Sequence, residues 1–408
     1  MTDLSGRPRI LFVAPWVPSV RRPRSLSMLR HLHALADVRC LVATWSDLDH
    51  RDAQDLPGGC TRVPGNKWHG ALRAGIGGLR GRSLQQSFAD SPGFRRALRA
   101  EIDRFAPDLV FFNVIRSAQW MDETGALPAI VDLDEKRSAY YAQRTRTGSW
   151  LSRAVATVEA GRMARAEIEA IGRASAVIVS SPVDSLLTEH PDRVVVLRSE
   201  PAISATRWSQ QAAVTGRLLF VGRLGYEANI EALHWFCSAV MPMLRERGVP
   251  VTLRIVGAEV DARVLRLAAA DVEVVGYVDD VGVEYARAQA VIVPVRAATG
   301  VQMKFIEALR VGAPTIATPI CVELAGMAAD EASLVADGPA DWCEAIEMLM
   351  ASPGAREQLS HRALNWSSAA YSTDARSVLE RLVGAALTAD RPAVAGRRPV
   401  TSGRGEEI

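Results

Sequence analysis

Residues 293–312 read VPVRAATGVQMKFIEALRVG and combine the end of a strand, a loop of small residues and the start of a helix. The apolar run 290–295 predicts a buried strand. The helical spacing of Phe305, Ile306 and Leu309 predicts a helix over 301–311. Such a helix begins with unpaired N–H groups at the positive end of its dipole, and α/β folds bind diphosphates at this position.

Three residues in this segment fit an anion site. Gly300 lacks the Cβ that would block a close approach of the backbone. Lys304 places a cation near the helix N-terminus, which is unfavourable unless an anion balances it. Glu307, one turn further on, can accept hydrogen bonds from both hydroxyls of a ribose. An ordinary amphipathic helix packed through its apolar side explains the same pattern, so this segment alone leaves both interpretations open.

The pattern extends outward in two series of alternating strands and helices. The series around this segment has strands at 217–221, 251–256, 272–275, 290–295 and 314–317, with helices at 229–243, 260–270, 281–288, 301–311 and 340–350. The earlier series has strands at 10–15, 38–43, 108–113, 129–132 and 176–180, with helices at 25–35, 94–105 and 152–173. Short parallel strands need helical crossovers. We therefore predict an α/β chain with two doubly wound, Rossmann-like domains that face each other across a cleft.

The limits of the domains follow from losses of periodicity. Residues 199–216 carry Pro, Ser, Thr, Gln and Gly and are predicted to link a domain over 1–198 to one over 217–368. A last helix is predicted over 369–386, within a segment 369–389. Residues 390–408, rich in Arg, Pro, Gly and Ser, are predicted to form a disordered tail.

Composition excludes several classes of protein. Of 408 residues, 48% are hydrophobic and 23% are charged, which is typical of a globular protein, and a net charge of +2 predicts no nucleic-acid partner. Neither the five scattered cysteines nor the seven histidines have metal-ligand spacing. No apolar run approaches the ~20 residues of a membrane span. We expect a cytoplasmic protein without a bound metal.

A second segment, 218–230, reads LLFVGRLGYEANI. Gly222 and Arg223 follow a strand, which places a guanidinium at the carboxyl end of the sheet, where ligands bind in open α/β folds. A guanidinium is suited to phosphate oxygens. A single arginine after a strand remains a weak signal.

The order and spacing of five segments resemble one family. They are Leu219-Phe220-Val221-Gly222-Arg223, Ile255-Val256-Gly257, Val275-Gly276-Tyr277-Val278, Glu307-Ala308-Leu309 with Gly312-Ala313-Pro314, and Ala317-Thr318 with Glu323. The chain resembles the GT-B family of retaining glycosyltransferases, group 4, and is similar to bacterial exopolysaccharide sugar transferases. The resemblance is strong over about 217–330 and looser elsewhere.

This resemblance implies roles for individual residues. Arg223, Lys304 and Glu307 would be catalytic: the two cations neutralise the donor diphosphate, and the glutamate, the second of an E-x7-E motif, holds the ribose. Tyr277 and Val278 would border the base. The other donor-binding positions are Gly222, Thr299, Gly300, Val301 and Gln302. The final helix, 369–389, would cross back to the first domain.

The chain departs from the family pattern at three positions. The first glutamate of E-x7-E falls on Thr299, and the lysine five residues after the arginine falls on Ala228. Lys304 supplies a charge in a G-x-x-x-K-x-x-E-A pattern. The histidine near the transferred sugar in some members aligns with Asn113.

Acceptor contacts are predicted from position in the first domain. Arg21, Arg22 and Arg24 follow the first strand and could meet an anionic acceptor such as a lipid-linked phosphate, or could simply be solvated. Asn113 and Asp132 end two further strands. Asp132-Leu133-Asp134 reads D-x-D, but its place after a strand of the first domain favours an acceptor-side or structural role over metal binding.

The expected function is transfer of a sugar from a nucleotide-diphosphate sugar to a saccharide, a lipid-linked precursor or a small secondary metabolite. We expect retention of configuration, no metal, and no cofactor besides the donor substrate. A nucleotide-sugar epimerase and a non-catalytic partner subunit are the alternatives. The charges of helix 152–173 fit a solvated face or a membrane or partner face. Peripheral contact with the inner face of the membrane therefore stays open, and the oligomeric state is not readable.

Overall fold

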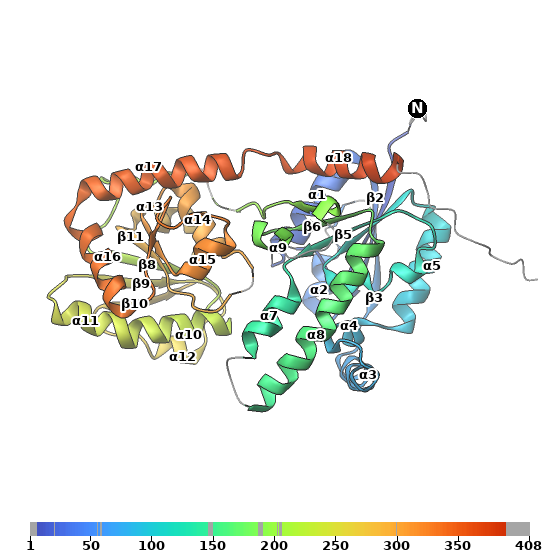
Figure 1. The fold of residues 1–408 in the computed structure, drawn as a ribbon, viewed down its shortest axis with the longest axis horizontal. Coiled ribbons are helices and arrows are strands. Elements are labelled where there is room, and N and C mark those ends of the chain that lie inside the picture. The colour runs from blue at the N-terminus through green and yellow to red at the C-terminus, as the bar shows by residue number, and fades with distance from the viewer. Residues whose placement is uncertain are drawn as a thin grey trace, which may run out of the picture.

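Two parallel sheets, each covered by helices, form two domains that lie side by side (Figure 1). The computed structural model describes residues 6–388 apart from 20, 55, 58, 146–149, 187–190, 202, 204, 205 and 299. The predicted tail 390–408 and Thr299 therefore lie outside the described residues. Among the described residues, no helix has both the length and the apolar character needed to cross a membrane.

The N-terminal domain is built on a seven-stranded parallel sheet in the order β3-β2-β1-β4-β5-β6-β7. Its strands are β1 (Arg9–Ala14), β2 (Asp37–Thr44), β3 (Cys60–Pro64), β4 (Leu109–Asn113), β5 (Ala129–Asp134), β6 (Ala176–Val179) and β7 (Val194–Val196). The strand order reverses between β1 and β4, so the loops after these two strands leave in opposite directions. This topological switch point is where doubly wound sheets form a crevice.

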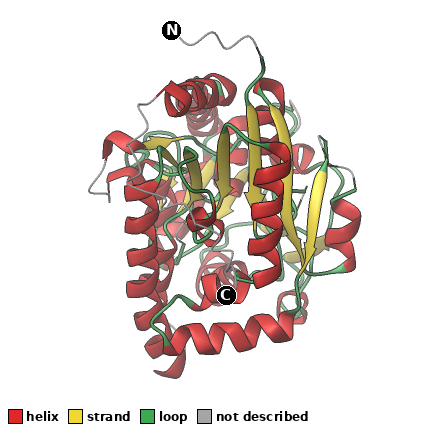
Figure 2. Ribbon diagram, turned by 90° about the vertical axis from the view of Figure 1, so that its right-hand side faces the viewer, coloured by secondary structure: helices red, strands yellow, loops and turns green. Residues whose placement is uncertain are grey.

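Nine α-helices connect the strands of this sheet within the described residues. They are α1 (Pro23–Leu35), α2 (Asp47–Asp52), α3 (Lys67–Leu79), α4 (Leu84–Ala89), α5 (Pro92–Phe105), α6 (Ile115–Ala118), α7 (Arg137–Arg144), α8 (Trp150–Arg173) and α9 (Pro182–Leu186). Figure 2 shows helices on both sides of the strands. The strands carry near-continuous apolar runs because both faces of the sheet are covered.

The C-terminal domain repeats the architecture with six parallel strands in the order β10-β9-β8-β11-β12-β13. They are β8 (Arg217–Val221), β9 (Thr252–Val256), β10 (Val272–Gly276), β11 (Ala290–Val293), β12 (Thr315–Ala317) and β13 (Leu334–Val335). Its helices are α10 (Glu227–Trp235), α11 (Met241–Glu246), α12 (Ala262–Leu265), α13 (Val281–Arg287), α14 (Met303–Val311), α15 (Pro319–Leu324), α16 (Pro339–Ala351) and α17 (Pro353–Ala370). The switch point here lies between β8 and β11.

The end of the chain differs from the single helix predicted over 369–386. The structure has α17 up to Ala370, a break, and then α18 (Ala375–Thr388). In Figure 1 these two helices run along the top of both domains. Val378, Leu379 and Leu382 of α18 are buried with Met28 and Leu29 of α1, so the last helix completes the N-terminal core.

Two other predicted helices are also interrupted. The helix predicted over 229–243 consists of α10, a π-helical segment (Phe236–Val240) and α11, and Pro242 lies in the first turn of α11. The helix predicted over 260–270 shrinks to the single turn of α12. The linker predicted over 199–216 is partly packed, because Trp208 is buried in the C-terminal core and donates from Nε1 to Ala288 O at 2.8 Å.

Candidate functional site

The carboxyl edges of the two sheets face each other at the junction of the domains. Glu135 follows β5, and a Cβ placed on Gly300, after β11, would lie 2.6 Å from its Oε2. Arg22, from the loop after β1, lies within electrostatic range of Arg223, which follows β8. The two switch points therefore form opposite walls of one site.

Lys304, in the first turn of α14, carries a charge that no carboxylate balances directly. Its Nζ donates to Asn229 Oδ1 at 3.0 Å and to Gln302 Oε1 at 3.1 Å, and it lies 5.6 Å from the centre of the Phe220 ring. No ion pair joins it to any carboxylate of the described residues. Burial lowers the pKa of Lys304 to about 8. Two neutral amide oxygens thus orient a cation whose charge remains available to an anion.

Glu307 lies one turn further along α14 and is half-buried. The hydroxyl of the fully buried Tyr285, on α13, is 3.0 Å from Glu307 Oε2 and donates to this oxygen. Burial raises the pKa of Glu307, while the hydrogen bond from Tyr285 and the charge of Lys304 oppose this rise. One carboxylate oxygen is therefore fixed by Tyr285, and the other remains for hydroxyl donors.

Gly222 and Gly257 bring the loops after β8 and β9 into direct contact. A Cβ on Gly257, whose φ is +155°, would lie 1.7 Å from Gly222 O, and a Cβ on Gly222 would lie 2.9 Å from Asn229 Nδ2. Asn229 Nδ2 donates to Arg223 O at 2.8 Å, which fixes the backbone of this loop. The Arg223 side chain itself is exposed, forms a 3.6 Å ion pair with Glu259 and lies 5.6 Å from the centre of the Tyr226 ring. Exposed contacts of this kind are weak, so its guanidinium can move toward a ligand.

The segment 300–302 leads into α14 and leaves the helix N-terminus open. Gln302 occupies the N-cap position but makes no side-chain hydrogen bond to the first turn. Its Nε2 donates instead to Gly300 O at 3.0 Å. Val301 is half-buried against the C-terminal core. The first N–H groups of α14 therefore have no side-chain cap, and they lie at the same end of the helix as Lys304.

Tyr277 and Val278 follow Gly276, whose φ of +84° turns the chain at the end of β10. Tyr277 is exposed, and Val278 packs against the core. The structure brings Gly222, Arg223, Lys304 and Glu307 together, whereas Tyr277 lies at the end of the edge strand β10, two strands away from β8.

The predicted acceptor-side residues Arg24, Asn113 and Asp132 are all buried and belong to one hydrogen-bonded network. Arg24 Nη2 donates to Asp132 Oδ1 at 2.7 Å, and Arg24 Nη1 donates to Leu197 O at 2.8 Å. Asn113 Nδ2 donates to Asp132 Oδ2 at 3.2 Å. This network ties α1, β4, β5 and the chain after β7 together.

Arg21 and Arg22 have different surroundings. Arg21 Nη2 donates to Asp52 Oδ2 at 2.7 Å, so its charge is compensated by α2. The guanidinium of Arg22 lies 4.2 Å from the centre of the Trp16 ring, and that of Arg116 lies 4.3 Å from the same centre. Among the described residues, neither Arg22 nor Arg116 forms an ion pair. Burial, together with the charges of Arg137 and Arg22, lowers the pKa of Arg116 to about 10.

Sequence reasoning missed Asn229, Tyr285, Trp16 and Arg116. Asn229 could have been found, because it starts the helix that follows the Gly222-Arg223 loop. Arg116 could not, because its position depends on Val114, which has a φ of +63° directly after β4. This conformation is strained for a β-branched residue and turns α6 toward the site.

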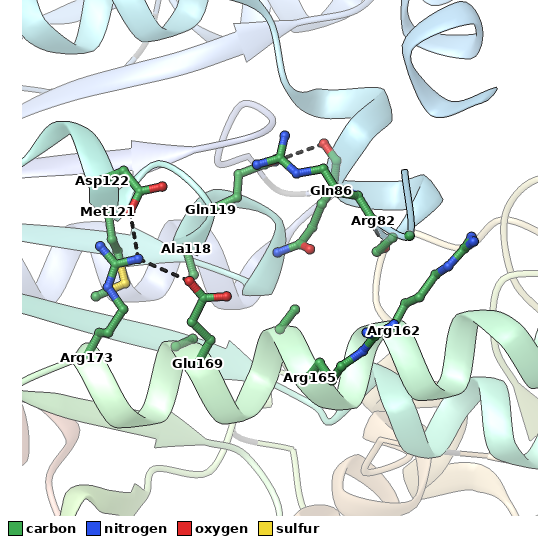
Figure 3. A pocket seen from close by; sticks show the side chains of 14 residues that line it. Arg82, Gln86, Ala118, Gln119, Met121, Asp122, Arg162, Arg165, Glu169 and Arg173 are labelled. Atoms are coloured by element: carbon green, nitrogen blue, oxygen red, sulfur yellow. Dashed lines mark hydrogen bonds and ion pairs between the residues drawn. The ribbon is translucent and has the colours of Figure 1, made fainter. Parts of the chain in front are cut away.

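A separate pocket of about 270 Å³ lies in the N-terminal domain, between α8 and the segment that joins α3 to α4 (Figure 3). None of the predicted site residues lines it. Among the described residues, no group of three or more His, Cys, Asp or Glu side chains is arranged to hold a metal ion.

Comparison with known protein families identifies the type of the C-terminal domain. Residues 215–352 match the model of the family described as glycosyl transferases group 1. No curated protein sequence matches the chain. This segment of the chain is therefore a glycosyltransferase domain, and the chain is a transferase.

Solved structures share the fold across both domains. Sucrose-phosphate synthase from Thermosynechococcus elongatus has a TM-score of 0.67 at 15% identity and covers 93% of this chain and 100% of that chain. Anabaena HepE in complex with UDP has a TM-score of 0.61 at 14% identity, with coverage of 92% and 98%. WaaG, a glycosyltransferase of lipopolysaccharide biosynthesis, has a TM-score of 0.58 at 14% identity, with coverage of 93% and 100%. The chain has the two-domain GT-B fold.

Proposed function

We propose that the chain transfers a glycosyl group from a nucleotide-diphosphate sugar to an acceptor, with retention of anomeric configuration and without a bound metal. The observation that carries this proposal is the Lys304 ammonium, which is oriented by Asn229 and Gln302 beside the open N-terminus of α14 and has no carboxylate partner among the described residues. A diphosphate supplies the charge that this arrangement lacks.

The donor is proposed to lie along the carboxyl edge of the C-terminal sheet. Lys304 and the first N–H groups of α14 hold the diphosphate, and Arg223 swings from Glu259 onto its oxygens. Glu307 accepts hydrogen bonds from the ribose with the oxygen that Tyr285 leaves free. Several solved structures of the similar HepE contain UDP or UDP-glucose, so uridine nucleotides are the first donors to test.

The chemical step needs a stabilised leaving group more than a protein nucleophile. The acceptor hydroxyl oxygen bonds to the anomeric carbon as the bond from that carbon to the diphosphate oxygen breaks, and the hydroxyl proton passes to the leaving diphosphate. Arg223, Lys304 and the α14 dipole take up the negative charge that develops on the diphosphate. Approach of the hydroxyl from the side of the leaving group accounts for retention.

The acceptor is proposed to bind on the N-terminal wall through an anionic group. Arg22 and Arg116 stack on Trp16 at the switch point of that sheet, and neither has a carboxylate partner among the described residues. A phosphate or carboxylate on the acceptor would compensate both charges. We therefore propose that Arg22 and Arg116 bind the anionic group of the acceptor, since Arg21 and Arg24 already form ion pairs within the chain.

Turnover of nucleotide sugars with and without acceptor tests the proposal. We expect nucleotide release and a new glycoside only when an acceptor is present. In proton NMR, the coupling constant of the anomeric proton of this glycoside should match that of the donor. Conversion of the donor to a second nucleotide sugar without acceptor would indicate an epimerase. Nucleotide binding without any turnover would indicate a non-catalytic subunit.

A further inference from the structure

Glu135 brings a carboxylate from the N-terminal domain to the segment that leads into α14. It is the first residue after β5, and a Cβ placed on Gly300 would lie 2.6 Å from its Oε2. It also lies within electrostatic range of Tyr226, which precedes α10, and of Arg116 on the N-terminal wall. These neighbours place the carboxylate between the two walls of the site, beside both loops of the C-terminal switch point.

The backbone on either side of Glu135 is held in place. Asp134 has a φ of +64°, which turns the chain at the end of β5, and its carbonyl oxygen accepts hydrogen bonds from Ser180 N and Oγ, both at 2.8 Å. Three residues after Glu135, Ser138 N donates to Oε1 of the buried Glu167 at 2.9 Å. A carboxylate on a segment that is fixed at both ends loses little freedom when it binds a ligand.

The Glu135 side chain is oriented by a neighbouring cation. Its Oε1 forms an ion pair with Arg137 Nη1, and the Arg137 guanidinium lies 4.6 Å from the centre of the Tyr140 ring. The side chains of Glu135 and Arg137 are 23% and 26% exposed, so both are accessible to a ligand. Arg137 therefore directs one carboxylate oxygen away from Gly300, and the other, Oε2, is the atom that faces this glycine.

The position of Glu135 matches that of the transferred sugar in the proposed donor complex. There the diphosphate lies at the N-terminus of α14, with the ribose toward Glu307. The sugar, at the other end of the diphosphate, then lies beside Gly300 and faces the N-terminal wall, because its anomeric carbon has to meet the acceptor bound there. Oε2 of Glu135 lies against the same glycine. Carboxylate oxygens accept strong hydrogen bonds from hydroxyls, which are the groups that a sugar ring offers.

We propose that Glu135 binds hydroxyl groups of the transferred sugar through Oε2 and so contributes to the recognition of the donor from the N-terminal domain. This inference rests on the proposed function, because it requires the donor diphosphate at the N-terminus of α14. It differs from a purely structural contact between the domains, which would affect the nucleotide and its sugar conjugate equally.

Calorimetric titration with a nucleotide and with its sugar conjugate tests the proposal. The nucleotide is the one among UDP, GDP, dTDP and ADP that binds the parent most tightly, and the conjugate is its tightest-binding hexose derivative. We expect Glu135→Gln to raise the ratio of the Kd of the conjugate to the Kd of the nucleotide by about 10- to 100-fold, the effect of losing a hydrogen bond to a charged group. The Kd of the nucleotide alone should stay the same or fall, because a negative charge near the diphosphate is removed.

Glu169→Gln is the matched control, because Glu169 is also paired with an arginine, Arg173, and lines the separate pocket of the N-terminal domain. It should leave both dissociation constants unchanged. Glu135→Asp is a second variant that keeps the charge and withdraws the carboxylate by one methylene, and it should raise the ratio in the same direction. Since both ligands are measured on the same protein, partial unfolding of a variant does not change the ratio.

Two results would overturn the proposal. One is an unchanged ratio in both Glu135 variants, and the other is an equal weakening of the nucleotide and the conjugate, which would indicate a structural contact between the domains. A parent that binds no nucleotide would contradict the proposed function itself, and this inference with it.

Discussion

The ammonium of Lys304 links the charge of the donor site to pH. Burial lowers its pKa to about 8, and a bound diphosphate would raise it again, so binding above this pH must take up a proton. We expect the affinity for a nucleotide-diphosphate sugar to be constant below about pH 8 and then to fall, approaching tenfold per pH unit. Calorimetric titration at pH 7 and pH 9 measures this. Lys304→Met should bind more weakly at pH 7 and lose the pH dependence, and an unchanged pH profile in that variant would contradict the assignment.

Substitution of Arg116 tests the proposed binding of an anionic acceptor. If its guanidinium binds an anionic group of the acceptor, Arg116→Ala should raise the KM for a phosphorylated acceptor by about 10- to 100-fold, since hydrogen bonds to charged groups contribute roughly 1.5–3 kcal/mol. Donor affinity should not change, because Arg116 lies on the opposite wall. Arg30→Ala, on the exposed side of α1, is the control. An equal effect on donor and acceptor would show that the substitution acts through the fold.

At the scale of elements, the loops after β8 and β9 depend on two glycines in contact. Gly257→Ala would place a methyl group 1.7 Å from Gly222 O at a backbone angle of +155°. We expect a loss of at least about 1–3 kcal/mol in the free energy of unfolding, the usual cost of such strain. Gly384→Ala on α18 meets open space and should be neutral or slightly stabilising. Denaturant titrations measure the free energy of unfolding of the two variants. Equal values would show that the two loops separate easily.

The sequence predicts the elements of the donor site better than those of the acceptor wall. The β11–α14 segment is local: one apolar strand, Gly300 and a regular helix place Lys304 and Glu307 with no information from distant residues. Arg116 and Trp16 meet only because the sheet order reverses between β1 and β4, which the sequence does not reveal. The pairing of Arg24 with Asp132 is hidden for the same reason, since Arg24 follows β1 and Asp132 ends β5, two strands away in the sheet.

The helices that were missed have specific causes. α3 contains Gly70, Gly75, Gly77 and Gly78, which weaken its helix signal, and its apolar residues face outward instead of into a core. The break between α17 and α18 follows from packing, because α17 belongs to the C-terminal domain and α18 to the N-terminal one. Periodicity alone carries no information about which core a helix joins.

At the scale of the whole molecule, α18 joins the end of the chain to the first domain. Leu379 is fully buried among residues of α1 and β1. Leu379→Ala should destabilise the N-terminal domain by about 2–5 kcal/mol. The nucleotide-induced shift in the melting of the C-terminal domain should persist. Differential scanning calorimetry resolves the two effects, with Glu380→Ala on the exposed side of α18 as the control. Equal destabilisation of both domains would mean that they unfold as one unit.

Two further contacts hold the domains together close to the chain crossing. Arg198 Nη1 donates to Ala325 O at 2.7 Å, and Ser181 Oγ donates to Leu324 O at 2.8 Å. Both contacts end on consecutive residues at the end of α15. At the site, Glu135 of the N-terminal domain approaches Gly300 of the C-terminal domain. We expect the domains to close on a donor by rotating about this crossing.

Calorimetric titration with UDP, GDP, dTDP and ADP, and with their common sugar conjugates, tests the central claim most directly. We predict that one nucleotide family binds the parent protein, and that Lys304→Met and Glu307→Ala each weaken this binding at least tenfold, whereas Arg116→Ala leaves it unchanged. Binding of no nucleotide, or equal binding by the parent and both α14 variants, would contradict a donor site at the N-terminus of α14.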